Sequence, residues 1–486
     1  MGLYTNRVYN PKFLCFDSML KNTLLTATPQ LPEGSFHKEI ESFHIITHPS
    51  RPSWAVINKF GWEILQQCNG RNSINDIINT IKYQYDISDS IIRNDIATFM
   101  QSITKSGIML NDELPVQANA AAIKSAFLHL TDTCNLHCKH CYAHNMSEGN
   151  PELTDKELTS FVEKFYEAGG KALVISGGEP LLRKNFTNIF EINPEAHFIL
   201  LTNATLIDEN YASFLSRFNV SIQVSIDGAT AGVHDSIRGD GAFHAAMMGI
   251  EHLQRSGLQK KINLCTTVMK QNINDLPNIF ALARSLGIPF VRFLPLRRKG
   301  NARTNWQDIQ GEVSAKDYEQ FYTYVFNTAM RQYPELDIRC GLSGFIVDPK
   351  KLMDDGHWCP IGKNIIIDTR GNVYPCSLLI NDRFKIGNIK ENTFNDILKH
   401  PTLLELMAAR NKRKDTIEKC KTCMWKNFCQ SSCLGSIFEQ QGTIWDTDEF
   451  CDFRIRLYEE SVIKLAHNRS SATPPMPIGD APEECF

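Results

Sequence analysis

The chain has 486 residues, of which 42% are hydrophobic and 22% are charged, and its formal net charge is −3. This length exceeds one ordinary domain and suggests three, with enough apolar residues for sizeable cores. The charge balance offers no basic surface, and no long apolar run follows the N-terminus, so we expect no nucleic-acid or membrane partner. The 15 cysteines would suggest disulfides in a small secreted chain, but here they indicate metal ligands in a reducing compartment. We therefore expect a cytoplasmic protein.

The N-terminal segment, residues 35–112, is predicted to be a small winged helix. Two or three short strands and three helices are expected. Two of the strands are placed at Phe43–Thr47 and Trp54–Asn58, and the helices at Gly61–Gln67, at Ile74–Ile81 and from Ser88 or Asp89 onward. Ser73 is a suitable cap for the second helix, and apolar residues recur at helical spacing along the third. A winged helix can also bind DNA, but this segment has no helix rich in lysine and arginine.

Three closely spaced cysteines come next along the chain. Cys134, Cys138 and Cys141 have the spacing C-x3-C-x2-C. Three thiolates on one short loop can hold three irons of a 4Fe–4S cube and leave the fourth iron open for a ligand. A structural zinc site is the alternative, because a nearby histidine could supply the fourth ligand; the candidates are His137, His140 and His144.

The next apolar run ends in a pair of glycines. Ala172–Ile175 has the composition of a buried strand, and Ser176-Gly177-Gly178-Glu179-Pro180 follows it. Glycines at such a place let backbone groups approach a ligand closely. A cysteine loop followed one β-α unit later by this turn resembles the radical S-adenosylmethionine (SAM) superfamily. The resemblance implies that Cys134, Cys138 and Cys141 hold the catalytic cluster. It also implies that the glycine turn binds the methionyl amine of SAM, and that the position before the third cysteine, which is often aromatic in the superfamily, lies at the SAM site. The implied SAM contacts are Gly177, Gly178, Glu179 and His140.

Further strands and helices alternate after the glycine turn. Strands are predicted at His197–Asn203, Val220–Gly228, Ile262–Val268 and Phe290–Pro295, and helices at Asp155–Glu167, Glu209–Phe218, Phe243–Ser256 and Asn274–Leu286. Alternating units of this kind imply a parallel sheet with right-handed crossovers. With the strand before Cys134, the six units predict an α/β core at residues 124–335. We expect a partial (β/α)6 radical SAM barrel with its site at the carboxyl ends of the strands.

Two polar residues of this core match SAM contacts of the superfamily. Ser225 lies in a Ser-x-Asp-Gly strand end and resembles the residue that contacts the ribose. Arg238 resembles the arginine that pairs with the SAM carboxylate, for which a planar bidentate donor is well suited. The alternative for Arg238 is a solvated loop cation.

A second group of cysteines lies in the C-terminal third. In chain order its members are Cys359, Cys376, Cys420, Cys423, Cys429, Cys433 and Cys451. This order resembles the cysteine-rich SPASM extension of radical SAM enzymes that modify peptides and proteins, which we expect at residues 336–460. By resemblance, one auxiliary cluster is held by the first auxiliary set, Cys359, Cys376 and Cys433. A second is held by the second auxiliary set, Cys420, Cys423, Cys429 and Cys451. A pair of zinc ribbons is the alternative.

Cys340 lies upstream of Cys359, and we favour it as a fourth ligand of the first auxiliary cluster. The alternatives are an open iron that binds the peptide and a buried thiol, since free cysteine is among the most buried residue types. At the end of the chain, residues 466–486 are predicted to form a mobile tail.

The resemblances together imply a function. The N-terminal segment resembles the PqqD-like recognition element of ribosomally made peptides, in which a leader peptide adds a strand to a sheet edge. The whole chain then resembles a radical SAM maturase that cleaves SAM reductively, abstracts hydrogen from a precursor peptide and leads to an intrapeptide cross-link such as a thioether. The implied cofactors are SAM, one SAM-binding 4Fe–4S cluster and two auxiliary clusters. The implied electron donor is a flavodoxin or ferredoxin.

Two other functions fit part of the pattern. One is maturation of a folded partner, such as a sulfatase or an amine dehydrogenase subunit. Sulfatase maturases carry an aspartate as general base after the cysteine that corresponds to Cys376, whereas this chain has Ser377. The other is a metal-stabilised peptide chaperone without turnover. The presence of the full set of SAM-site candidates argues against it: Cys134, Glu179, Ser225 and Arg238.

Overall fold

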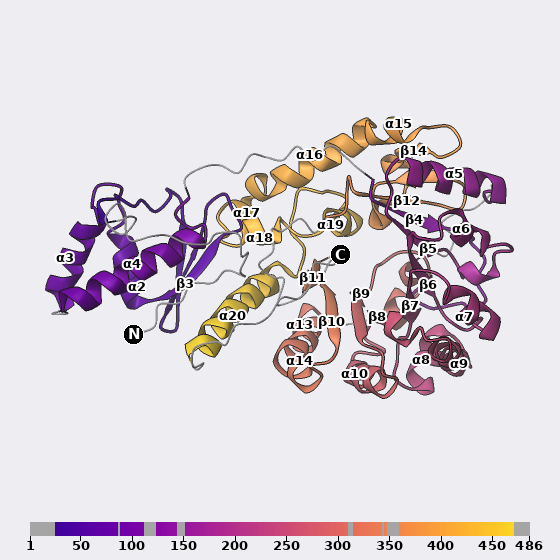
Figure 1. Cartoon of the computed structure of the whole chain (residues 1–486). Coiled ribbons are helices and arrows are strands. Elements are labelled where there is room, and N and C mark those ends of the chain that lie inside the picture. Colours follow the sequence, from indigo (N-terminus) through magenta and orange to yellow (C-terminus); the bar gives the residue numbers. More distant parts are fainter. Residues whose placement is uncertain are drawn as a thin grey trace.

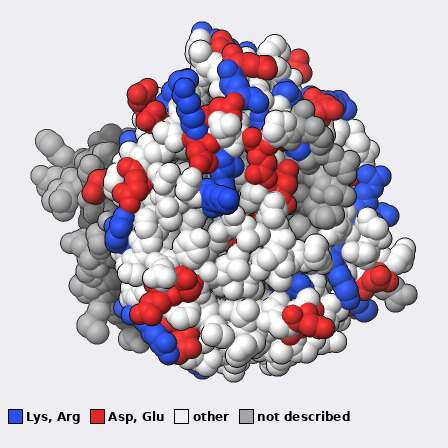
Figure 2. Space-filling view, turned by 90° about the vertical axis from the view of Figure 1, so that its right-hand side faces the viewer, with Lys and Arg blue, Asp and Glu red and all other residues white. Residues whose placement is uncertain are grey.

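The structure is a computed structural model of the chain and describes residues 25–85, 88–110, 123–142, 151–309, 314–342, 345–347 and 359–470. A small sheet with helices comes first, a parallel α/β core follows, and a cysteine-rich part returns between the two (Figure 1). This order confirms the predicted fold class. No helix in the described ranges combines the length and the apolar character needed to span a membrane. On the face toward the right of Figure 1, acidic and basic side chains are interspersed (Figure 2).

The N-terminal part contains a three-stranded antiparallel sheet and three helices. The strands are β1 (Phe36–Ile40), β2 (Phe43–Thr47) and β3 (Trp54–Asn58), in the order β1-β2-β3, and the helices are α2 (Lys59–Gln66), α3 (Ile74–Tyr85) and α4 (Asp89–Lys105). Ser73 caps α3 as predicted, because its hydroxyl accepts from the Asp76 amide while Asp76 accepts from the Ser73 amide. This reciprocal pair satisfies two backbone donors at the helix start.

Both faces of strands β2 and β3 are buried. One face packs against the helices of the same part, through Ile46, Ala55 and Ile57. The opposite face joins the main core of the molecule, through Phe43, Ile45, Trp54 and Val56. Helix α20 (Cys451–Ser470) lies beside β3 (Figure 1), and the ring of Phe43 meets His467 of that helix edge-on. The N-terminal part is therefore docked on the C-terminal part rather than tethered to it.

The core is an eleven-stranded sheet. Its six central strands are parallel neighbours in chain order, as predicted: β4 (Ser125–His129), β5 (Ala172–Ser176), β6 (His197–Thr202), β7 (Val220–Ser225), β8 (Ile262–Val268) and β9 (Phe290–Pro295). Beyond the six, β10 (Asp337–Leu342) adds parallel to β9, and β12 (Asn364–Ile367) adds parallel to β4. Three short antiparallel strands complete the edges: β11 (Phe345–Val347), β13 (Asn372–Tyr374) and β14 (Gly387–Asn388).

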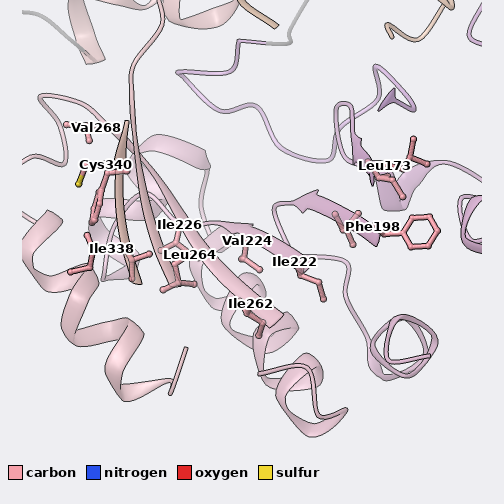
Figure 3. Close-up of a cluster of buried hydrophobic side chains, with 14 of the residues drawn as sticks. Leu173, Phe198, Ile222, Val224, Ile226, Ile262, Leu264, Val268, Ile338 and Cys340 are labelled. Atoms are coloured by element: carbon pink, nitrogen blue, oxygen red, sulfur yellow. The ribbon is translucent and has the colours of Figure 1, made fainter. Parts of the chain in front are cut away.

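Helices cover the outer face of this sheet. They are α5 (Asp155–Glu167), α6 (Asn188–Ile192), α7 (Glu209–Leu215), α8 (Ala231–Arg238), α9 (Ala242–Arg255), α10 (Leu276–Ser285) and α13 (Ala315–Tyr324). Side chains of the strands alternate between the two faces. Ile222, Val224 and Leu264 belong to the apolar layer under the helices (Figure 3). The residues between them, such as Gln223 and Asn263, face the inside of the partial barrel.

The C-terminal part consists mainly of helices: α15 (Phe394–Leu398), α16 (Pro401–Thr416), α17 (Glu418–Lys421), α18 (Lys426–Cys429), α19 (Leu434–Gln441) and α20. The predicted tail began at residue 466, but α20 continues to Ser470. Residues 471–486 of that prediction lie outside the described residues.

Candidate functional site

The loop after β4 brings the first three cysteines together. Cys138 is buried, and Cys134 and Cys141 are partly buried. Burial raises the pKa of the Cys138 thiol to about 11, while the guanidinium of Arg238 acts in the opposite direction and the thiols of Cys134 and Cys141 add to the rise. Three thiols within electrostatic reach of one another, beside a cation that stabilises thiolate, are a suitable donor set for an iron–sulfur cluster.

The two glycines after β5 allow this loop to pack closely against the sheet. A Cβ on Gly177, whose φ is +146°, would lie 2.5 Å from the Thr131 carbonyl oxygen, and one on Gly178 would lie 2.3 Å from that of Thr133. The Gly178 amide donates to the Thr131 carbonyl at 2.6 Å. Close backbone approach thus explains why glycine is needed at both positions. Contact of the glycines with SAM stays a prediction.

Glu179 anchors the ends of β5 and β6 beside the cysteine loop. Its carboxylate is 1% exposed and accepts from the Thr202 hydroxyl at 2.7 Å and from the Asn203 amide at 2.8 Å. Burial raises the pKa of Glu179 to about 7, against the effect of these hydrogen bonds. The side-chain amide of Asn203 in turn lies 4.0 Å from the sulfur of Cys134. Asn203 was not among the predicted site residues, although it closes the third predicted strand.

A buried carboxylate organises the other side of the loop. Asp227 is fully buried; its Oδ2 accepts from Nε of Arg238 at 2.6 Å and lies 3.2 Å from Nε2 of His140. Nη1 of Arg238 lies 3.8 Å from the sulfur of Cys138. Arg238 is thus a buried, paired cation and not a solvated one. Burial lowers the pKa of His140 to about 4, although Asp227 opposes this shift, so the imidazole is neutral near pH 7.

Asp227 was missing from the predicted site. The signal available in the sequence was its place two residues after Ser225, in the quoted Ser-x-Asp-Gly strand end. Ser225 itself is partly exposed at the end of β7 and in register with Cys265 of β8. The predicted ribose contact is therefore at the correct end of the barrel, and the contact itself stays a prediction.

The second auxiliary set lines one cavity. Cys420, Cys423, Cys429 and Cys451 share its wall with Trp425, Arg454 and Tyr458. Arg454 is buried, and its guanidinium pairs with Asp448 at 2.7 Å. Burial raises the pKa of the Cys420 and Cys451 thiols, and the nearby guanidinium of Arg454 opposes this rise. The thiolate is the form of cysteine that binds metal.

The first auxiliary set also comes together. Burial raises the pKa of the Cys376 thiol to about 12, and the nearby thiols of Cys433 and Cys359 add to the rise. Cys359 likewise lies within electrostatic reach of Cys433. Within the described ranges, no three His, Cys, Asp or Glu side chains are grouped closely enough for a single metal ion. The three thiols of the first auxiliary set nevertheless lie within electrostatic reach of one another.

A strained turn joins the two auxiliary sets. Gln430, Ser431 and Ser432, between Cys429 and Cys433, all have positive φ values of 51°, 64° and 68°. Non-glycine residues adopt this conformation at a cost of roughly 1 kcal/mol each or more. The buried Arg413 holds the turn by donating to the Ser432 carbonyl at 3.1 Å. The ligands of the two sets are thus fixed relative to one another, consistent with the interleaved order of the cysteines.

The structure does not support ligation by Cys340. This residue lies on β10 opposite Phe293 of β9, is 1% exposed and belongs to the apolar layer under the helices, near Ile338 and Val268 (Figure 3). Burial alone raises the pKa of its thiol, whereas the thiols of the first auxiliary set influence one another. The strand alternation turns Cys340 toward the helices, which agrees with the buried-thiol alternative.

A parallel α/β barrel with a cluster-binding cysteine loop at its carboxyl ends and a cysteine-rich extension defines the class of radical SAM enzymes. Three family models match the chain: the radical SAM superfamily over residues 128–283, the SPASM iron–sulfur cluster-binding domain over 359–424, and coenzyme PQQ synthesis protein D over 44–109. The chain is thus a radical SAM enzyme with a SPASM extension and a PqqD-like N-terminal domain, and it belongs to a class that uses SAM and a 4Fe–4S cluster.

Curated relatives include enzymes of two kinds. An AdoMet-dependent heme synthase of Methanosarcina barkeri is 29% identical over 345 residues, which cover 67% of this chain and 95% of the relative. The mycofactocin maturase MftC of Mycolicibacterium smegmatis is 28% identical over 316 residues, which cover 64% of this chain and 77% of the relative.

Solved structures share the fold. Native anSMEcpe with bound AdoMet has a TM-score of 0.59 at 22% identity, covering 71% of this chain and 99% of that one. Streptococcus suis SuiB bound to its precursor peptide SuiA has a TM-score of 0.55 at 13% identity, covering 87% and 99%. The second match extends over more of this chain than the first.

Proposed function

We propose that the enzyme cleaves SAM reductively, removes hydrogen from a ribosomally made precursor peptide and so leads to an intrapeptide cross-link, a thioether or a similar bond. The observation that carries this proposal is the PqqD-like sheet docked on the auxiliary cysteine region of a radical SAM core. A peptide held by that sheet would be tethered to the same rigid body that contains the barrel. MftC and SuiB, which the chain resembles, are a maturase and a precursor-binding protein by name.

Different residues around the cysteine loop would bind the cluster and separate parts of SAM. Cys134, Cys138 and Cys141 would hold the SAM-binding cluster, and Glu179 would accept from the methionyl ammonium. Ser225 would contact the ribose, and Arg238 the carboxylate. When bound, the cluster and SAM supply the electron and the 5′-deoxyadenosyl radical that abstracts hydrogen. The contribution of the protein is position and a site that excludes water.

The auxiliary sets would hold two further 4Fe–4S clusters. The second set offers four thiols and therefore complete ligation. The first set offers three once Cys340 is assigned to the apolar layer, so one iron of that cluster would be open to a peptide thiolate or another ligand. A flavodoxin or ferredoxin would donate the electron for SAM cleavage, and an auxiliary cluster would accept the electron left after coupling.

The PqqD-like part would bind the leader by strand addition. Among the described residues, the outer strands β1 and β3 of this sheet each have one side to which no strand is hydrogen-bonded. Backbone pairing there supplies affinity, and side-chain pockets supply specificity. Residues 35–112, 124–335 and 336–460 would form the recognition, catalytic and auxiliary domains, although β10 and β12 extend the catalytic sheet into the last of these.

A second candidate is chemistry on a tetrapyrrole, which the identity to a heme synthase favours. Parallel anaerobic reactions with SAM and dithionite distinguish the two. The proposal expects 5′-deoxyadenosine formation coupled to a mass change in a co-expressed precursor peptide. Modification of iron coproporphyrin III with no change in any peptide would overturn it. A protein that produces no 5′-deoxyadenosine would instead be a chaperone.

A further inference from the structure

A row of polar side chains crosses the inside of the barrel at one level. Ser225 of β7 is in register with Cys265 of β8, Cys265 with Arg292 of β9, and Arg292 with Arg339 of β10. Paired residues of neighbouring parallel strands lie on the same face. The residues that flank Arg292, Val291 and Phe293, are buried in the layer under the helices. Arg292 therefore faces the barrel interior.

Arg292 has no neutralising partner in the part of the chain that the structure describes. Its Nε is buried and without a hydrogen-bond acceptor. Its neighbour Arg339 differs in this respect, because its guanidinium pairs with Asp337 at 2.8 Å. Two guanidinium groups on adjacent strands, of which one has no carboxylate partner among the described residues, create a local excess of positive charge. A buried donor without an acceptor is costly, so this place is suited to an anionic ligand.

We propose that Arg292 binds a carboxylate of the substrate inside the barrel. A planar guanidinium with several N–H donors matches a carboxylate in bidentate geometry. Because the row places Arg292 two strands from Ser225, their backbones are about 10 Å apart, and a long side chain can reach back over this distance. The substrate class that follows is a peptide with an acidic side chain or a free C-terminus at the reacting segment, a conclusion that rests on the proposed function.

The methionyl group of SAM also carries a carboxylate, so the carboxylate of the substrate must be distinguished from that of SAM. The SAM side of the site has its own cation, Arg238, next to Cys138 and the cysteine loop. β9 is separated from β4, which precedes that loop, by four intervening strands. The position of Arg292 therefore favours the substrate carboxylate.

Binding of three short probes to the full chain, anaerobically reconstituted and loaded with SAM, tests this proposal. The probes are acetyl-Gly-Glu-Gly-amide, its Gln counterpart and acetyl-Gly-Gly-Gly with a free carboxylate, followed by ligand-observed NMR. We expect at least one acid probe to bind about tenfold more tightly than the Gln probe, as for a charge-assisted bidentate contact. Arg292→Gln should abolish this preference, and Arg292→Lys should keep part of it. Arg255→Gln, on the exposed face of α9, should retain it fully, and SAM affinity should be unchanged in all variants.

Three results would overturn the carboxylate site: equal binding of acid and Gln probes by the unaltered chain, an acid preference that survives Arg292→Gln, or a loss of SAM affinity in Arg292→Gln, which would assign Arg292 to SAM. Iron content of each variant confirms that the fold is retained. Formation of 5′-deoxyadenosine in the same samples tests the proposed function separately. A preference for the acid probes without SAM cleavage would support the carboxylate site at Arg292 and contradict the proposed enzymatic function.

Discussion

The hydroxyl of Thr47 donates to the carbonyl of Met424 at 2.8 Å. Thr47 ends strand β2 of the PqqD-like part, and Met424 directly follows Cys423 of the second auxiliary set. A second link lies close by, since the Asn427 side chain donates to the carbonyls of His48 and Pro49, each at 3.1 Å. The recognition sheet is thus joined to the loop that carries Cys423 and Cys429.

The first prediction concerns this junction. Asn427 is 2% exposed, and Asn427→Ala leaves two backbone carbonyls without their donor, at a cost of about 1–3 kcal/mol. We expect a lower midpoint of unfolding and loss of iron from the second auxiliary set, with the SAM-binding cluster retained. Iron analysis with EPR spectroscopy measures both. Asn395→Ala, at an exposed position of α15, is the matched control; identical iron content in the two variants would show that the junction does not support the cluster.

The second prediction concerns the glycine turn. Gly178→Ala places a Cβ 2.3 Å from the Thr133 carbonyl oxygen, so the cysteine loop must shift. We expect loss of about four irons per chain and of all SAM cleavage. Gly232→Ala on α8 meets no atom within 4 Å and should behave as the unaltered chain. Normal iron content and normal 5′-deoxyadenosine formation by Gly178→Ala would show that the close approach is not required.

The third prediction is a pH dependence of SAM binding. Burial raises the pKa of Glu179 to about 7, so the carboxyl is neutral at pH 6 and ionised at pH 8. An ammonium partner requires the ionised form. SAM affinity should therefore fall as pH drops below about 7, by up to tenfold per pH unit in the limit. Calorimetry on Glu179→Gln should give weaker binding with a flat profile in the same range. If SAM binding by Glu179→Gln kept the same pH dependence, a group other than Glu179 would be responsible for it.

The fourth prediction separates two cysteines of the C-terminal half. Cys376→Ala should remove the first auxiliary cluster and about four irons. Cys340→Ala should retain full iron, because this thiol packs in the apolar layer under the helices. Its effect should be a modest loss of stability of about 1 kcal/mol from the small cavity. An equal loss of iron in both variants would show that Cys340 is a ligand of the first auxiliary cluster.

Sequence patterns predicted the local features of this molecule well. The six core strands were visible because each is a short apolar run between turn residues, and the Ser73 cap because its chemistry is local. Asp227 was missed because its importance depends on α8 returning Arg238 to the end of β7. The addition of β10 and β12 to the sheet was missed for a related reason, since strand pairing over long separations leaves no local signature.

Cys340 shows the limit of reasoning from spacing. Its position upstream of Cys359 is compatible with ligation, but the direction of its side chain is set by the register of β10 against β9. A shift by one residue would turn it to the other face. The docking of the N-terminal sheet was equally hidden, because Phe43 and Ile46 look alike in sequence although they face different cores.

The proposed function requires that the SAM-derived radical removes hydrogen from the peptide. The measurement uses a precursor peptide that was produced without the enzyme and labelled uniformly with deuterium, incubated anaerobically with the reconstituted enzyme, SAM and dithionite. Mass spectrometry of both products should show deuterium in 5′-deoxyadenosine and a matching loss of hydrogen isotopes from the peptide. SAM cleavage that yields only unlabelled 5′-deoxyadenosine, with the peptide unchanged, would show that the radical does not act on this peptide.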